Sequence, residues 1–141
     1  MPADDKTLTI VQEWVARAEN DFKSAAHLLK MKNYCPTDTV CFHAQQCIEK
    51  YLKVLLVMQG TDFPKTHDLE RLLALIPQPK RPELANEEQD RLTDYATITR
   101  YPGDYEPISL AEARRAVRIA RRVRTEIRKT LPKKAFRRRR Y

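Results

Sequence analysis

Polar groups interrupt an otherwise apolar stretch near the middle of the chain, CFHAQQCIEKYLKVLL, which covers residues 41–56. The apolar residues recur at three- and four-residue spacing, so they share one face of a helix and are buried together: Val40, Ala44, Ile48, Leu52 and Leu55. A neighbouring stripe at the same spacing carries imidazole, amide and ammonium groups: His43, Gln46, Lys50 and Lys53. This stripe forms a line of hydrogen-bond donors and acceptors beside the core. The alternative is a solvated helix face, on which an i,i+4 pair such as Glu49 and Lys53 contributes only about 0.2 to 0.5 kcal/mol.

Two further segments carry groups that can bind anions or transfer protons. His67 follows Lys65 in KTHDLERLLALIP, where the imidazole acts either as a base or phosphate donor, or as a helix-entry side chain hydrogen-bonded to nearby backbone. Arg100 lies in the loop RYPGDYEP, whose prolines favour a fixed, bidentate geometry of the guanidinium toward phosphate or carboxylate. Tyr101 beside it either stacks on a base or packs under the loop.

The cysteines and histidines do not predict a metal centre. His43 and Cys47 share a helix face, but two ligands do not complete a tetrahedral site. The three cysteines form no C-x-x-C pair and are poor material for a disulfide framework, so we expect reduced thiols. We predict no metal ion and no cofactor.

Positive charge is concentrated at the end of the chain. Residues 110–141 hold 14 Lys and Arg against 2 acids, a net charge of +12, whereas the rest of the chain has a net charge of −4. This asymmetry predicts a polyanionic partner, an acidic protein surface, or a merely solvated face. The tail KKAFRRRRY has no core pattern, so we expect residues 132–141 to be a flexible basic tail that includes Arg137, Arg138, Arg139 and Arg140.

Apolar periodicity and helix-start signals place these groups on helices. The first helix is predicted over residues 9–31 and the second over residues 37–58, with Gly60 at its C-terminal turn. Thr66 is predicted to cap a short helix that Pro77 ends. A helix over residues 87–97 follows, and Ser109 with Glu112 forms a capping box for the last helix, which frays near Pro132.

Composition indicates a single all-α domain. Two glycines among 141 residues, with abundant Leu, Ala, Arg, Lys and Glu, favour helices over a turn-rich sheet. The chain length suits one compact domain, which we place at residues 1–131. We find neither a membrane span nor a secretory signal and therefore expect a cytoplasmic protein without membrane contact.

With this organisation in view, nearly the whole chain resembles the HEPN family of helical nucleotide-binding domains. The segments that carry the resemblance are, in order, WVARAENDFKSAAHLL, CFHAQQCIEKYLKVLL, KTHDLERLL and RYP. The resemblance implies an up-and-down bundle of four to five helices, usually a homodimer, with a polar groove associated with nucleotides or RNA. It also implies a minimal nucleotidyltransferase as partner, in a toxin–antitoxin arrangement. Gln46, Lys50 and Lys53 would then line the groove, unless they belong to a solvated face.

The sequence departs from the ribonuclease members of this family. Those members carry an Arg followed, after four to six residues, by His, near the start of the last long helix. Here Arg100 and four intervening residues lead to Tyr105, and a tyrosine with an ordinary pKa of about 10 is a poor base near neutral pH. No other catalytic motif is present.

We therefore assign no catalytic residue and predict a non-catalytic nucleotide- or RNA-binding module. The alternatives are a degenerate ribonuclease that uses Arg100 with Tyr105 or His67, and a purely structural interaction scaffold.

Overall fold

The computed structural model describes residues 3–97, 103 and 106–136 of the chain. These residues form helices and turns and contain no strand, which confirms the all-α prediction. The long helices are α1 (Asp5–Leu28), α2 (Thr37–Met58) and α5 (Leu110–Arg128). Two shorter helices, α3 (Leu69–Ala74) and α4 (Asn86–Thr97), lie between α2 and α5 in sequence. Short 3-10 turns complete the structure: η1 (Leu29–Tyr34), η2 (Gln78–Lys80) and η3 (Lys133–Phe136).

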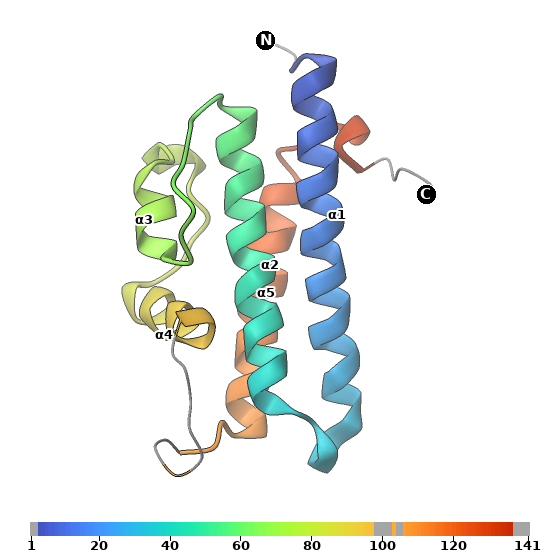
Figure 1. Cartoon of the computed structure of the whole chain (residues 1–141), viewed down its shortest axis with the longest axis vertical. Helices are drawn as coiled ribbons and strands as arrows, with labels where there is room; N and C mark the ends of the chain where they lie inside the picture. Colours follow the sequence, from blue (N-terminus) through green and yellow to red (C-terminus); the bar gives the residue numbers. More distant parts are fainter. Residues whose placement is uncertain (1–2, 98–102, 104–105, 137–141) are drawn as a thin grey trace.

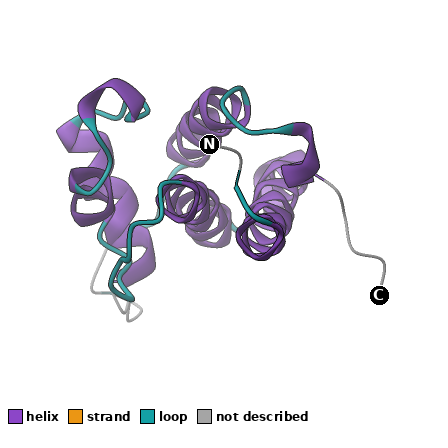
Figure 2. Cartoon of the chain, turned by 90° about the horizontal axis from the view of Figure 1, so that it is seen from above, coloured by secondary structure: helices purple, strands orange, loops and turns teal. Residues whose placement is uncertain are grey.

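Helix α2 occupies the centre of the bundle. It packs against α1 and α5 along its length, and against α4 and α3 on another side. Figure 1 shows the three long helices side by side, with α5 behind α2 and the α3–α4 pair flanking them. The view from above separates the same two groups (Figure 2). Helix α2 therefore contacts each of the other four α-helices that the described residues form.

The core forms from the apolar faces that the helices turn toward one another. Burial of these side chains is the main stabilising term of such a bundle. The buried residues of the long helices include Val11, Val15, Ala18, Ala25, Ile48, Leu52, Leu56, Val117, Ala120, Val123 and Ile127. Leu69, Leu72 and Leu92 add the apolar faces of α3 and α4 to the same core.

The first helix begins one turn earlier than predicted and ends three residues sooner. Asp4 is its N-cap, because the Asp4 carboxylate accepts a hydrogen bond of 2.7 Å from the backbone N–H of Thr7. The apolar pattern begins only after this polar first turn, so periodicity alone missed the start. After Leu28 the chain continues as η1, in which Lys32 has a φ of 51°.

The end of α2 and the start of α3 carry the residues that were predicted to end or cap these helices. Gly60, after α2, has a φ of 70°, as expected for a glycine that follows a helix C-terminus. Thr66 was predicted to cap α3, but Asp68 is the N-cap and accepts from the backbone N–H of Arg71. Thr66 lies two residues earlier, and its hydroxyl accepts from the N–H of Asp68 at 3.1 Å. Both are good capping residues, so the sequence did not distinguish them.

Helix α5 begins at the predicted position. The Ser109 hydroxyl accepts a 3.0 Å hydrogen bond from the backbone N–H of Glu112. The Glu112 carboxylate does not complete the reciprocal half of a capping box within the described part of the chain; it accepts from Arg91 and Tyr95 of α4 at 2.8 and 2.7 Å. Glu112 thus joins α5 to α4.

The first part of the predicted flexible tail is folded. Lys133–Phe136 form η3, Ala135 is buried, and the Gln12 amide donates to the backbone oxygen of Lys134 at 2.8 Å. The Arg128 guanidinium lies 4.2 Å from the centroid of the Phe136 ring. A single alanine and phenylalanine carry no period, which is why the pattern did not reveal this contact with α1. Residues 137–141, including Arg137, Arg138, Arg139 and Arg140, lie outside the described residues.

Candidate functional site

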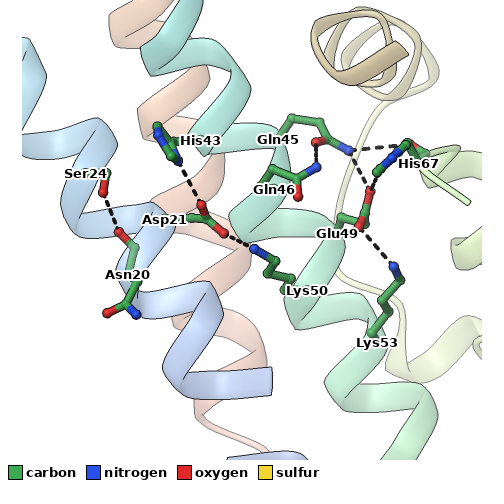
Figure 3. Close-up of polar contacts among 10 residues, drawn as sticks. All are labelled: Asn20, Asp21, Ser24, His43, Gln45, Gln46, Glu49, Lys50, Lys53 and His67. Atoms are coloured by element: carbon green, nitrogen blue, oxygen red, sulfur yellow. Dashed lines mark hydrogen bonds and ion pairs between the residues drawn. The ribbon is translucent and has the colours of Figure 1, made fainter. Parts of the chain in front are cut away.

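The polar stripe of α2 divides into two hydrogen-bonded clusters (Figure 3). The first cluster joins α2 to α1 through Asp21, whose side chain is almost entirely buried. One carboxylate oxygen lies 2.8 Å from Nδ1 of His43, and the other accepts a hydrogen bond from the Lys50 ammonium. The carboxylate therefore holds an imidazole and an ammonium that lie about two turns apart on the same helix.

The second cluster is centred on Glu49, which is 3% exposed. One oxygen of the Glu49 carboxylate accepts from the Lys53 ammonium at 3.0 Å, and the other lies 2.6 Å from Nδ1 of His67. The Gln45 amide also donates to Glu49, at 3.2 Å, and accepts from Gln46 at 2.7 Å. All side chains of this cluster have partners, as a buried polar network requires.

Two aromatic rings lie near the Lys53 ammonium. It lies 5.3 Å from the centroid of the Trp14 ring and 5.9 Å from that of Phe63. The two rings meet edge to face, with centroids 6.5 Å apart. Since the Lys53 side chain is only 10% exposed, the pair with Glu49 does not lie on a wet helix face, and the solvated-face interpretation of this pair is wrong.

A third cluster joins α1 to α2 and α5. Arg124 makes a bidentate contact with Glu19, at 2.7 and 2.6 Å, and the Tyr51 hydroxyl donates to the same carboxylate. Burial raises the pKa of Glu19, but the hydrogen bonds from Arg124 and Tyr51 outweigh it, so the net pKa is lowered. Burial and the bond to Glu19 raise the pKa of Tyr51. Glu19 is thus held ionised between three elements.

The arginines of α5 fall into two groups. Arg122 and Arg124 are tied to carboxylates, at 2.9 Å from Glu88 and 2.6 Å from Glu19 respectively. Arg128 lies 3.4 Å from Glu19 as well. A second group is exposed and makes no ion pair with the described residues: Arg114, Arg115, Arg118 and Arg121. We call these four residues the α5 arginine group.

Comparison with known proteins gives the family of this helical arrangement. The HEPN domain model matches residues 11–130. The chain belongs to the HEPN domain family. The crystal structure of TT1696 from Thermus thermophilus is similar, with a TM-score of 0.68 and 25% sequence identity over 86% of this chain and 98% of that one.

One curated relative of this HEPN domain is the protein named "Putative toxin MJ1304" from Methanocaldococcus jannaschii. The two sequences are 42% identical over 50 residues, which are 36% of this chain. The match spans about a third, 31%, of the length of that relative. The family and the bundle are thereby established, whereas the activity and partners of the whole relative bear on this HEPN domain only as proposals.

The structure gives internal partners to four predicted site residues of this HEPN domain. Gln46, Lys53 and His67 meet in the Glu49 cluster, and Lys50 belongs to the Asp21 cluster. Of the two interpretations of His67, the helix-entry one expected its imidazole to bond to nearby backbone. The imidazole instead lies against the Glu49 carboxylate, while the His67 backbone oxygen accepts from Gln45 at 3.4 Å. A ligand role for these residues stays a prediction. Arg100, Tyr101 and Tyr105 lie outside the described residues.

Sequence reasoning missed the two acids that organise these clusters. Asp21 stands among apolar residues at core spacing, three positions after Ala18 and four before Ala25. A carboxylate at such a position indicates a buried partner, and His43 and Lys50 were available. Glu49 was noticed only as the partner of Lys53, because nothing local reveals that His67 also bonds to its carboxylate.

The remaining expectations concern metals and membranes. Across residues 3–97, 103 and 106–136, no group of three His, Cys, Asp or Glu side chains is placed to hold a metal ion. Burial raises the pKa of the Cys47 thiol, so this residue is an inert core group rather than a ligand. None of the described helices combines the length and apolar character needed to span a bilayer.

Proposed function

We propose that this HEPN domain is a non-catalytic nucleotide- or RNA-binding dimer that acts with a minimal nucleotidyltransferase in a toxin–antitoxin pair. The observation that carries the binding part is the α5 arginine group. Its guanidinium groups are exposed and have no carboxylate partner in the described chain, whereas neighbouring arginines of the same helix are neutralised. Guanidinium groups in this state bind phosphate readily, because no internal ion pair must first be broken.

The spacing within the α5 arginine group suits a phosphate backbone. Arg114, Arg118 and Arg121 follow one side of the helix at i, i+4 and i+7, and at 1.5 Å per residue they span about 10 Å. A row of this length reaches more than one phosphate of an extended strand. Because such contacts address phosphate and not base edges, we expect binding to depend weakly on sequence.

The non-catalytic part rests on the missing ribonuclease motif. The sequence lacks the Arg-to-His spacing of ribonuclease members, because the residue after Arg100 and four intervening residues is Tyr105. The toxin–antitoxin part is supported by the family and by the name of the archaeal relative. The dimer is supported by the family resemblance and by the frequency of two-fold assemblies. Light scattering that shows a monomer at high micromolar concentration would contradict it.

Salt-dependent binding to a single-stranded RNA tests the proposal. With four phosphate contacts, log K should change by about −0.7 per contact against log salt, so affinity should fall about 50-fold between 50 and 200 mM salt. In the variant R114Q/R118Q/R121Q, the slope of log K against log salt should be smaller in magnitude by about 2, and binding should be weak at every salt concentration. The variant K6Q/R71Q/K80Q removes the same charge from exposed residues elsewhere and should behave like wild type.

Three results would refute the proposal or part of it. If wild type does not bind RNA or nucleotide at 50 mM salt, the binding function is wrong. If both charge variants weaken binding equally, the effect is net charge and not the α5 arginine group. If wild type cleaves the RNA with multiple turnovers, the non-catalytic assignment is wrong. Truncation after Phe136 measures the contribution of residues 137–141 while retaining the buried Ala135.

A further inference from the structure

An aromatic ring and an imidazole lie next to each other in the first half of α2. Phe42 is 40% exposed, which is unusual for a phenylalanine on the central helix of a bundle. Its ring meets the His43 ring edge to face, with centroids 5.6 Å apart and planes inclined by 70°. The pair is therefore a partly open aromatic surface bordered by a polar ring.

The His43 imidazole has a fixed orientation. Nδ1 lies 2.8 Å from the buried Asp21 carboxylate, which the Lys50 ammonium holds from the other side. A carboxylate at Nδ1 favours the tautomer with its proton on that nitrogen, which leaves a lone pair on Nε2. Nε2 has no hydrogen-bond partner in the described part of the chain, and the side chain is 28% exposed. His43 consequently presents a hydrogen-bond acceptor at the surface.

A stacking face beside an oriented acceptor matches the chemistry of a ribonucleotide. Every nucleobase has a π-face that stacks on an exposed aromatic ring, and stacking of this kind tolerates any base. The ribose 2′-hydroxyl is the donor that distinguishes RNA from DNA. A phosphate oxygen carries no proton to donate to Nε2, so an isolated anion does not fit this acceptor.

We propose that Phe42 and His43 form a subsite for one unstacked nucleotide of single-stranded RNA. The base stacks on Phe42, and Nε2 of His43 accepts a hydrogen bond from the 2′-hydroxyl. Asp21 is a positioning residue that sets the tautomer. The subsite rests on the proposed function, because it presumes that the protein binds RNA, and it adds the preference for single strands and for ribose.

The subsite is separate from the α5 arginine group. Asp21 and His43 meet between α1 and α2 (Figure 3), whereas α5 lies behind α2 (Figure 1). The two surfaces are proposed to bind different parts of a nucleic acid. The α5 arginine group binds phosphates of any nucleic acid, whereas the subsite binds an unstacked base and its ribose. Variants of each surface can therefore be distinguished by the nucleic acid that is offered.

The test compares a fluorescent single-stranded RNA, the DNA of the same sequence, and an RNA duplex. Phe42→Ala should weaken binding of both single strands about 5- to 100-fold and leave the duplex unchanged, because duplex bases are already stacked. Phe42→Trp should retain single-strand binding. Tyr34→Ala removes a ring that is 86% exposed at the end of η1 and should change nothing. His43→Ala should weaken RNA binding about 2- to 10-fold without affecting DNA, so the preference for RNA falls.

Further arms address positioning and the source of the nucleotide. Asp21→Asn should reduce the RNA preference as His43→Ala does, with an unchanged circular dichroism spectrum. An excess of free nucleoside monophosphates should not displace the strand; displacement would show that the subsite takes a free nucleotide and would overturn the strand assignment. The subsite proposal is wrong if Phe42→Ala weakens duplex and single-strand binding equally. It is also wrong if His43→Ala weakens RNA and DNA binding equally. If R114Q/R118Q/R121Q still weakens binding in that case, the proposed function stands without the subsite. If wild type binds none of the three nucleic acids, both proposals fail.

Discussion

Removal of the Glu49 carboxylate tests the buried cluster most directly. Glu49→Ala leaves the Lys53 ammonium, in a side chain only 10% exposed, without its carboxylate. Breaking a buried pair by deleting one partner typically costs about 3 to 5 kcal/mol, because the remaining charge stays desolvated. The rings of Trp14 and Phe63 return at most about 2 kcal/mol of cation–π attraction, which the wild type already has. We therefore expect a loss of about 3 to 5 kcal/mol in the free energy of unfolding.

Urea unfolding followed by circular dichroism at neutral pH measures this loss. Glu70→Ala is the matched control, because Glu70 is an exposed acid of the neighbouring helix α3 and should change stability by less than about 0.5 kcal/mol. Lys53→Met should cost less than Glu49→Ala, since Glu49 retains His67 and Gln45 as partners. A loss below about 1 kcal/mol in Glu49→Ala would refute the reasoning.

The double variant Glu49→Leu with Lys53→Met separates the energy of the pair from the cost of an orphaned charge. Replacing a buried ion pair by apolar groups of similar volume is often neutral or stabilising by about 1 to 4 kcal/mol. We expect the free energy of unfolding of this variant to be no more than about 1 kcal/mol below that of wild type. A double variant as unstable as Glu49→Ala would show that the carboxylate contributes through Gln45 and His67 and not through Lys53.

Three further predictions concern individual contacts. Hydrogen bonds from Arg124 and Tyr51 outweigh burial and lower the pKa of Glu19 in the folded protein. The stability that ionised Glu19 contributes is therefore present above its unfolded pKa near 4.5 and is lost as the pH falls through the folded pKa. In acid titrations of unfolding, the difference in stability between wild type and Glu19→Gln should narrow below about pH 4.5. Ser109→Ala removes the N-cap of α5 and should cost about 1 kcal/mol in urea, whereas Ser109→Asp should not. A Cβ at Gly60 would meet no atom within 4 Å, so the effect of Gly60→Ala on stability comes from the φ of 70° alone. We expect the free energy of unfolding, measured by thermal melting, to fall by about 1 kcal/mol.

Local sequence determined the elements of the fold better than their ends. The apolar periods of α1, α2 and α5 located these helices, although α2 is buried well beyond the one face that its period marks. The start of α1 at Asp5 and the cap at Asp68 depend on single side chains without a period, and competing candidates stood nearby. The contact of Ala135 with α1 is long-range and has no local signal.

The candidate site was predictable in composition and not in arrangement. The stripe of His43, Gln46, Lys50 and Lys53 was visible as polar residues at helical spacing, but its division between two carboxylates was not. That division depends on α1, which supplies Asp21 through a core position, and on the segment 61–68, which covers Glu49. A helix period describes one element, whereas a hydrogen-bonded cluster is a property of several packed together.

The internal partners of Lys53 bear on where a polyanion binds. For its ammonium to reach a phosphate, Lys53 must leave Glu49, and a carboxylate that is 3% exposed would lose its closest cation. That separation costs several kcal/mol, while a new charge-assisted hydrogen bond to phosphate returns about 1.5 to 3 kcal/mol. The α5 arginine group incurs no such cost, because its four guanidinium groups are exposed and make no ion pair with the described residues. The balance therefore favours the α5 arginine group over Lys53 for phosphate contacts, and the Glu49 cluster serves to hold α2 and the segment 61–68 together.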